Sequence, residues 1–113
     1  MARRDTLDGF LKIVGGGEGV SLCHLAPCTS LLVWTLNSLY RMVIMHPPEV
    51  WVRGGAFFHE PTTARLVGSS SVPGSWLKVG WIGVGLRIEL RSRDQYVVTS
   101  PVRAISRTDP PAV

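Results

Sequence analysis

The stretch Trp76–Leu90, WLKVGWIGVGLRIEL, contains the clearest structural pattern in this chain of 113 residues. Its last part alternates between two faces, with Leu86, Ile88 and Leu90 on one and Arg87, Glu89 and Arg91 on the other. A period of two residues is typical of a half-buried strand in an antiparallel sheet that has one face in water. The sequence therefore predicts that Ile88 lies in a core and that Glu89 faces solvent.

The glycines in this stretch, Gly80, Gly83 and Gly85, raise the question of a nucleotide-binding loop. Their order, G-x-x-G-x-G, reverses the dinucleotide fingerprint G-x-G-x-x-G, and a strand follows where that motif requires a helix. A loop of this kind would lack the helix N-terminus that binds pyrophosphate. The glycines are better interpreted as points where a strand bends, so that a small sheet can curl toward closure.

Other short runs rich in β-branched and aromatic residues flank this stretch. They cover residues 30–36, 38–45, 50–54, less certainly 64–68, and 95–106. In the second run, Tyr40, Met42 and Ile44 share the face that we expect to be buried, opposite Leu39, Arg41 and Val43. Pro101 predicts a bulge, an edge or a break in the last run, and the segment SSSVPGS before Trp76 predicts a loop tip.

These runs predict an all-β fold, because they give about six short strands and no helix longer than about two turns. A small antiparallel barrel or a compact sandwich fits this pattern, and we favour a barrel of the SH3-like kind, whose closure removes exposed strand edges. We expect a loosely ordered, irregular N-terminal arm over residues 1–29, a single β domain over 30–107 and a flexible tail over 108–113.

Cysteine and histidine spacing gives no indication of a metal site. Cys23 and Cys28 are separated by four residues, and His24, His46 and His59 lack the paired spacing of zinc modules. We favour free thiols over a disulfide or a metal site, and we expect neither a cofactor nor a metal. The longest apolar window contains Asn37 and Arg41 and is too short to span a bilayer, so a cytoplasmic protein without membrane contact is expected.

Residues suited to catalysis are few. His59 and Glu60 form the best acid–base pair, but neighbours on a strand point to opposite faces, and no nucleophile with its base is evident. The sequence therefore favours a protein that is not an enzyme.

Binding is the remaining class of function. The net charge is +4, and aromatic and basic residues are interleaved in the second half of the chain. The candidate binding residues are Trp76, Lys78, Arg87, Arg91 and Arg103. Tryptophans in a domain this small are more often needed for packing, so we expect most of them in the core. The preferred hypothesis is a β domain that acts through protein contacts, as an oligomer or an accessory subunit; the alternative is a barrel that binds nucleic acid.

Overall fold

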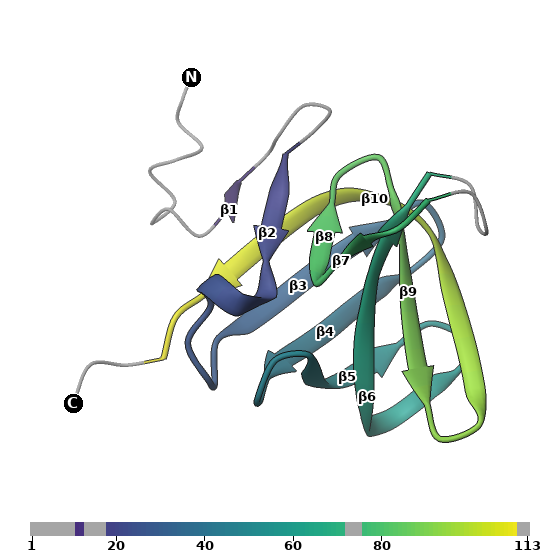
Figure 1. The fold of residues 1–113 in the computed structure, drawn as a ribbon, viewed down its shortest axis with the longest axis horizontal. Helices are drawn as coiled ribbons and strands as arrows, with labels where there is room; N and C mark the ends of the chain where they lie inside the picture. The colour runs from purple at the N-terminus through teal and green to yellow at the C-terminus, as the bar shows by residue number, and fades with distance from the viewer. Residues whose placement is uncertain (1–10, 13–17, 72–75, 111–113) are drawn as a thin grey trace.

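Strands account for nearly all the regular structure, which confirms the predicted all-β class. The computed structural model describes residues 11–12, 18–71 and 76–110 (Figure 1). Its strands are β1 (Leu11–Lys12), β2 (Gly19–Ser21), β3 (Ser30–Thr35), β4 (Leu39–Ile44), β5 (Glu49–Gly54), β6 (Phe58–Ser70), β7 (Lys78–Val79), β8 (Trp81–Gly83), β9 (Arg87–Ser92) and β10 (Gln95–Thr108). A short 3-10 turn, η1 (Leu22–His24), follows β2.

Six of these strands close into a ring. Each strand in the order β3, β4, β5, β6, β9 and β10 pairs antiparallel with the next, and β10 pairs back with β3. Short strands β1 and β7 extend this sheet beside β10 and β6, and β2 pairs with β8 outside it. Closure protects the backbone edges of the six strands.

Two strands of the ring are longer than the sequence predicts, since β6 has 13 residues and β10 has 14. Each of these strands pairs with one neighbouring strand along its first part and with another along its second part. Strand β10 pairs with β9 up to Pro101 and with β3 from Val102, and its register with β9 shifts between Val98 and Pro101. Of the bulge, edge or break predicted at Pro101, the structure shows an irregular register, and β10 continues through it as one strand.

The core lies inside the ring and is built mainly from aliphatic side chains, with Phe58 as its largest fully buried side chain. Ile88 and Leu90 are fully buried there, which confirms the phase predicted for this strand, and Leu86 is half-buried. The predicted inner face of β4, formed by Tyr40, Met42 and Ile44, is also buried.

The stretch that suggested a nucleotide loop forms three strands, β7, β8 and β9. Gly80 lies between β7 and β8 with φ of +66°, and Gly85 lies between β8 and β9 with φ of +88°. Both values fall in the left-handed region that glycine adopts without strain. The two glycines thus make turns between separate strands, whereas the sequence predicts bends within one strand.

Part of the predicted N-terminal arm belongs to the folded domain. Strand β2 pairs with β8, and Leu22 and Leu25 are buried in the core, so the packed chain begins before Ser30. Two isolated leucines give no periodic pattern, which is why the sequence does not reveal them. Residues 1–10 and 13–17 of the arm, 72–75 of the predicted loop tip and 111–113 of the tail lie outside the described residues.

Candidate interaction surface

The outer face of β3, β4 and β5 presents large apolar side chains to solvent. Alternation along each strand sends one set of side chains into the core and the other set outward. Apart from Ser30 and Glu49 at the strand ends, the outward set comprises Leu32, Trp34, Leu39, Arg41, Val43, Trp51 and Arg53, and we refer to these seven residues as the Trp51 face. Leu39 is 45% exposed and Trp51 is 48% exposed.

Strand register arranges this face in three neighbouring rows. Trp34 lies opposite Leu39 in the first row, and Val43 lies opposite Trp51 in the third. The middle row runs from Leu32 through Arg41 to Arg53. Directly paired residues on a sheet face have Cβ atoms about 4.5–5.5 Å apart, so the apolar side chains form a continuous surface with two arginines at its centre.

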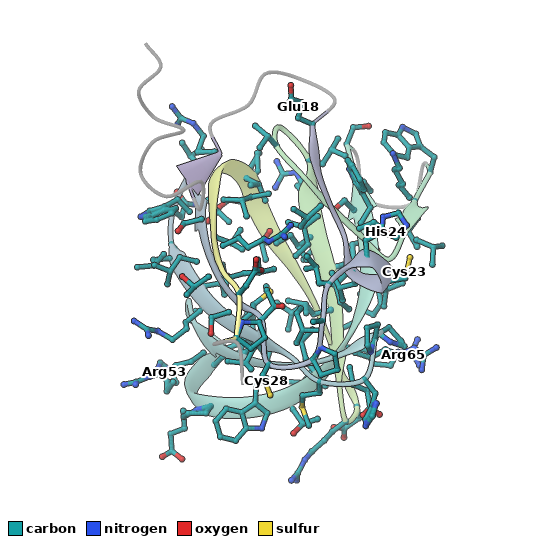
Figure 2. All side chains as sticks on the ribbon, turned by 90° about the vertical axis from the view of Figure 1, so that its left-hand side faces the viewer. Glu18, Cys23, His24, Cys28, Arg53 and Arg65 are labelled. Carbon is teal, nitrogen blue, oxygen red and sulfur yellow. The ribbon has the colours of Figure 1, made fainter. Side chains whose placement is uncertain are left out.

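The arginines of the Trp51 face have no acidic partner in the described part of the chain, where the only ion pair joins Arg107 to Asp109 at 2.9 Å. Figure 2 shows the Arg53 side chain pointing away from the ring. Glu49 lies at the far end of β5, opposite Arg65 on β6 rather than beside Arg41. The centre of the face is therefore positively charged.

A second exposed region lies around the hairpin of β6 and β7. We call Trp76, Lys78 and Trp81, which begins β8, the Trp76 hairpin. Trp76 is 50% exposed, and Val79 on β7 is also exposed. The Lys78 ammonium lies 3.8 Å from the centroid of the Trp81 ring, a cation–π contact. Trp76 and Lys78, both predicted as binding residues, thus belong to one hairpin.

None of the four tryptophans lies in the buried core, so the expectation of mostly core tryptophans is wrong. Trp51 and Trp76 are exposed, and Trp34 and Trp81 are half-buried. The ring explains this placement, because the tryptophans on β3 and β5 occupy outward positions while leucine, isoleucine, valine and Phe58 fill the interior.

The three arginines predicted as binding residues do not gather at the Trp76 hairpin. Arg87 is half-buried and its guanidinium donates to the Thr99 carbonyl oxygen at 3.4 Å. Arg91 lies four residues further along β9, about 13 Å away at the usual strand rise, with its guanidinium 5.8 Å from the centre of the Tyr96 ring. Arg103 is exposed on β10, where the register with β3 shifts.

Glu89 does not face water, so this prediction is wrong. Its side chain is only 6% exposed. The Ser70 hydroxyl donates to Glu89 Oε2 at 2.5 Å, and the Tyr96 hydroxyl donates to Oε1. This bond to Glu89, together with burial, raises the pKa of the Tyr96 hydroxyl above its ordinary value. The carboxylate lies on the outer face of β9 but is covered by neighbouring side chains.

Groups that could support catalysis or metal binding are dispersed. His59 and Glu60 are both exposed near the start of β6. Cys23 and Cys28 are free and exposed, and Figure 2 shows Cys23 beside His24, apart from Cys28. Within residues 11–12, 18–71 and 76–110, no group of three or more His, Cys, Asp or Glu residues could hold a metal ion, and no helix is long and apolar enough to cross a membrane.

The Trp51 face is the feature that the sequence interpretation missed, although its signal was present. The alternation that predicts a buried Tyr40 and Met42 also leaves Leu39 and Val43 on the outside. Apolar residues at outward positions of neighbouring strands indicate an exposed apolar surface.

Comparisons of the chain with protein-family models, with curated proteins and with solved structures found no match.

Proposed function

We propose that this protein is a non-enzymatic binding module whose Trp51 face contacts a protein partner. The observation that carries this proposal is the pair of apolar rows on either side of Arg41 and Arg53. Tryptophan and arginine are enriched at the centres of protein interfaces, where exposed apolar side chains lose their contact with water. The closed ring holds the seven side chains on paired strands, which reduces the entropy lost on binding.

The charge of the face indicates the chemistry of the partner. Arg41 and Arg53 lie in the middle row, so a second copy docked about a two-fold axis through the centre would place arginines against arginines. Like charges at an interface oppose association. The face is better matched by a different protein that presents apolar side chains around one or two carboxylates, because arginine pairs with carboxylates in bidentate geometry. This assignment favours an accessory subunit over a self-associating protein.

The test compares two tryptophans that are exposed to nearly the same extent, Trp51 at 48% and Trp76 at 50%. The wild-type protein, Trp51→Ser and Trp76→Ser would each be immobilised and exposed to extract from the source cells. Bound proteins would be quantified by mass spectrometry. We expect a partner that the wild-type protein and Trp76→Ser retain and that Trp51→Ser loses, since a central interface tryptophan contributes about 2 kcal/mol or more.

Two results would contradict this proposal. Equal retention of every bound protein by all three variants would show that the Trp51 face takes no part in binding. A concentration-dependent dimer in sedimentation velocity, abolished by Trp51→Ser, would show that the face binds a second copy instead.

A nucleic-acid-binding barrel is the second candidate, favoured by the exposure of Trp76 next to Lys78. An exposed tryptophan beside a cation can stack on a base of a single strand. The scattering of Arg87, Arg91 and Arg103 makes this candidate weaker. Titration of a labelled oligonucleotide at low and at physiological salt tests it, because binding through phosphates weakens steeply with salt. Absence of binding at low salt would eliminate this function.

A further inference from the structure

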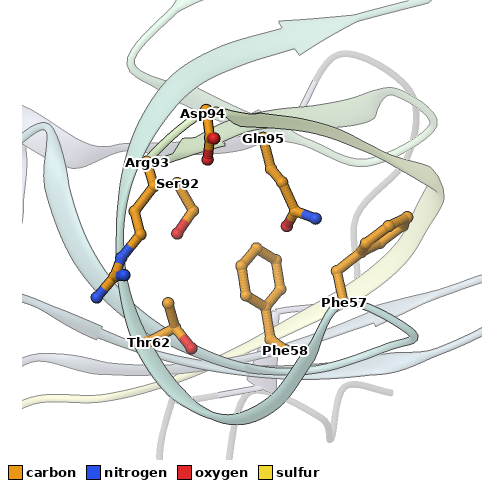
Figure 3. A pocket seen from close by; sticks show the side chains of 7 residues that line it. All are labelled: Phe57, Phe58, Thr62, Ser92, Arg93, Asp94 and Gln95. Atoms are coloured by element: carbon orange, nitrogen blue, oxygen red, sulfur yellow. The ribbon is translucent and has the colours of Figure 1, made fainter.

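A pocket of about 330 Å³ lies at one end of the ring, between the turn from β5 to β6 and the turn from β9 to β10 (Figure 3). Its apolar part is formed by Phe58, which is buried, and by Phe57, which is 57% exposed. Small-molecule sites usually have volumes of about 300–1,000 Å³ and combine apolar walls with a few polar groups. The pocket therefore has a volume at the lower end of the range for small-ligand sites, and its lining is more polar than usual.

Some polar groups of the pocket already have partners. The Thr62 hydroxyl donates to the Glu60 carbonyl oxygen at 2.8 Å, and the Ser92 hydroxyl donates to the Thr63 carbonyl oxygen at 3.2 Å. Recognition of a ligand thus depends on the remaining polar side chains, Arg93, Asp94 and Gln95.

The two charged side chains of the pocket point to different parts of it. Figure 3 shows the Arg93 guanidinium near Thr62 and the Asp94 carboxylate further along the pocket, between Arg93 and Gln95. They form no ion pair with each other, because the one ion pair of the described chain lies elsewhere. A ligand that carries a carboxylate and an ammonium can satisfy both charges, whereas a simple anion would face Asp94 unpaired.

Arg93 adopts a backbone conformation that arginine seldom takes. It occupies the first position of the two-residue turn between Ser92 and Gln95, with φ of +57°. Turns of this kind favour glycine, asparagine or aspartate at positive φ. A strained residue at a concave site points to a role for its side chain, here the placement of a guanidinium near Thr62 at the edge of the pocket.

We propose that this pocket binds a free α-amino acid with a large apolar side chain. The ligand carboxylate pairs with Arg93, its ammonium pairs with Asp94, and its side chain packs against Phe57 and Phe58. This site is separate from the Trp51 face, so the inference does not depend on the proposed protein contact.

The test is a titration of the ¹⁵N-labelled protein, followed by the amide resonances of residues 92–95. L-Phenylalanine is the probe, and three relatives each lack one recognised group: N-acetyl-L-phenylalanine lacks the ammonium, L-phenylalaninamide lacks the carboxylate, and L-alanine lacks the large side chain. We expect saturable shifts with L-phenylalanine in the millimolar range or tighter, and binding at least about tenfold weaker for each relative. Equal binding of N-acetyl-L-phenylalanine, or no saturable shift with L-phenylalanine, would overturn the proposal.

Substitution of Arg93 separates a ligand-binding role from a structural one. Arg93→Gly removes the guanidinium and relieves the positive φ, so we expect L-phenylalanine binding to fall at least about tenfold while the melting temperature stays the same or rises. Arg103→Gln, at an exposed position of β10 outside the pocket lining, is the matched loss of one positive charge and should leave L-phenylalanine binding unchanged. Unchanged binding by Arg93→Gly would show that Arg93 does not contact the ligand.

Discussion

The outer surface of β3, β4 and β5 differs from the outer surface of β6, β9 and β10, although both belong to the same closed ring. On the first side, Leu39 and Trp51 are exposed to solvent and Arg41 lies between them. On the second side, Glu89 is buried beneath Tyr96 and Ser70. A charged residue is thus covered while a tryptophan is exposed, which is the reverse of what polarity alone predicts.

This comparison shows what alternation along a strand determines. It decides which side chains point into the ring, because neighbouring residues point to opposite faces. It does not decide whether an outward side chain meets water, since that depends on what neighbouring strands place over it. The apolar side chains on the outer surface of β3, β4 and β5 are therefore the ones that a partner protein would bury.

The largest effect is expected from Ile88→Asp, which places a carboxylate inside the ring. Ile88 is fully buried among apolar side chains. An unpaired charge there should cost at least about 4 kcal/mol, a large part of the stability of a domain this size. Urea denaturation followed by tryptophan fluorescence should show no cooperative transition, or one at much lower urea. A transition close to that of the wild-type protein would show that the phase assigned to β9 is wrong.

Glu89→Lys should also destabilise the protein, by about 1–3 kcal/mol, although Glu89 lies outside the ring. The substitution removes the acceptor of two hydroxyl groups and leaves an ammonium in their place. Glu89→Gln is the matched control, because its amide oxygen can still accept one of these bonds, and it should cost less. If Glu89→Lys has the same urea midpoint as the wild-type protein, Glu89 faces water and the contrast between the two sides disappears.

Tyr96 should make stability sensitive to alkaline pH. Its pKa is raised in the folded protein from an ordinary value of 10.0, chiefly by its hydrogen bond to Glu89. The folded protein therefore holds the hydroxyl proton more tightly than the unfolded chain does. This stabilisation is complete below about pH 10 and is lost as pH rises through the folded pKa. Urea midpoints measured from about pH 8 to 11 should fall less steeply in Tyr96→Phe than in the wild-type protein; identical slopes would argue against the bond to Glu89.

Trp51→Ser and Trp76→Ser should have the smallest effects on stability, each below about 1 kcal/mol, because both side chains are half in water. Thermal denaturation checks this expectation. It matters for the binding experiment, since a loss of partner by Trp51→Ser can be attributed to the surface only if the domain remains folded. A large fall in melting temperature for Trp51→Ser would make Trp51 a structural residue and remove it from the proposed interface.

The sequence predicts the interior of the ring better than its surface. Periodicity places Met42, Ile88 and Leu90 inside, because a buried face repeats every second residue. It finds only residues 64–68 of β6, because Gly68 resembles a strand end although it lies within one long strand from Phe58 to Ser70. The pocket is not predictable in this way, because its lining residues come from two turns that are far apart in the chain. The exposure of Trp51 depends equally on contacts between distant segments.

The most direct measurement of the proposed interface is hydroxyl-radical footprinting of the wild-type protein, free and in complex with the partner captured above. Trp51 and Trp76 should be oxidised at similar rates in the free protein, because their exposed fractions are 48% and 50%. In the complex, Trp51 should be protected and Trp76 should be oxidised as before. Protection of Trp76 with continued oxidation of Trp51 would contradict the proposal and place the binding surface on the Trp76 hairpin.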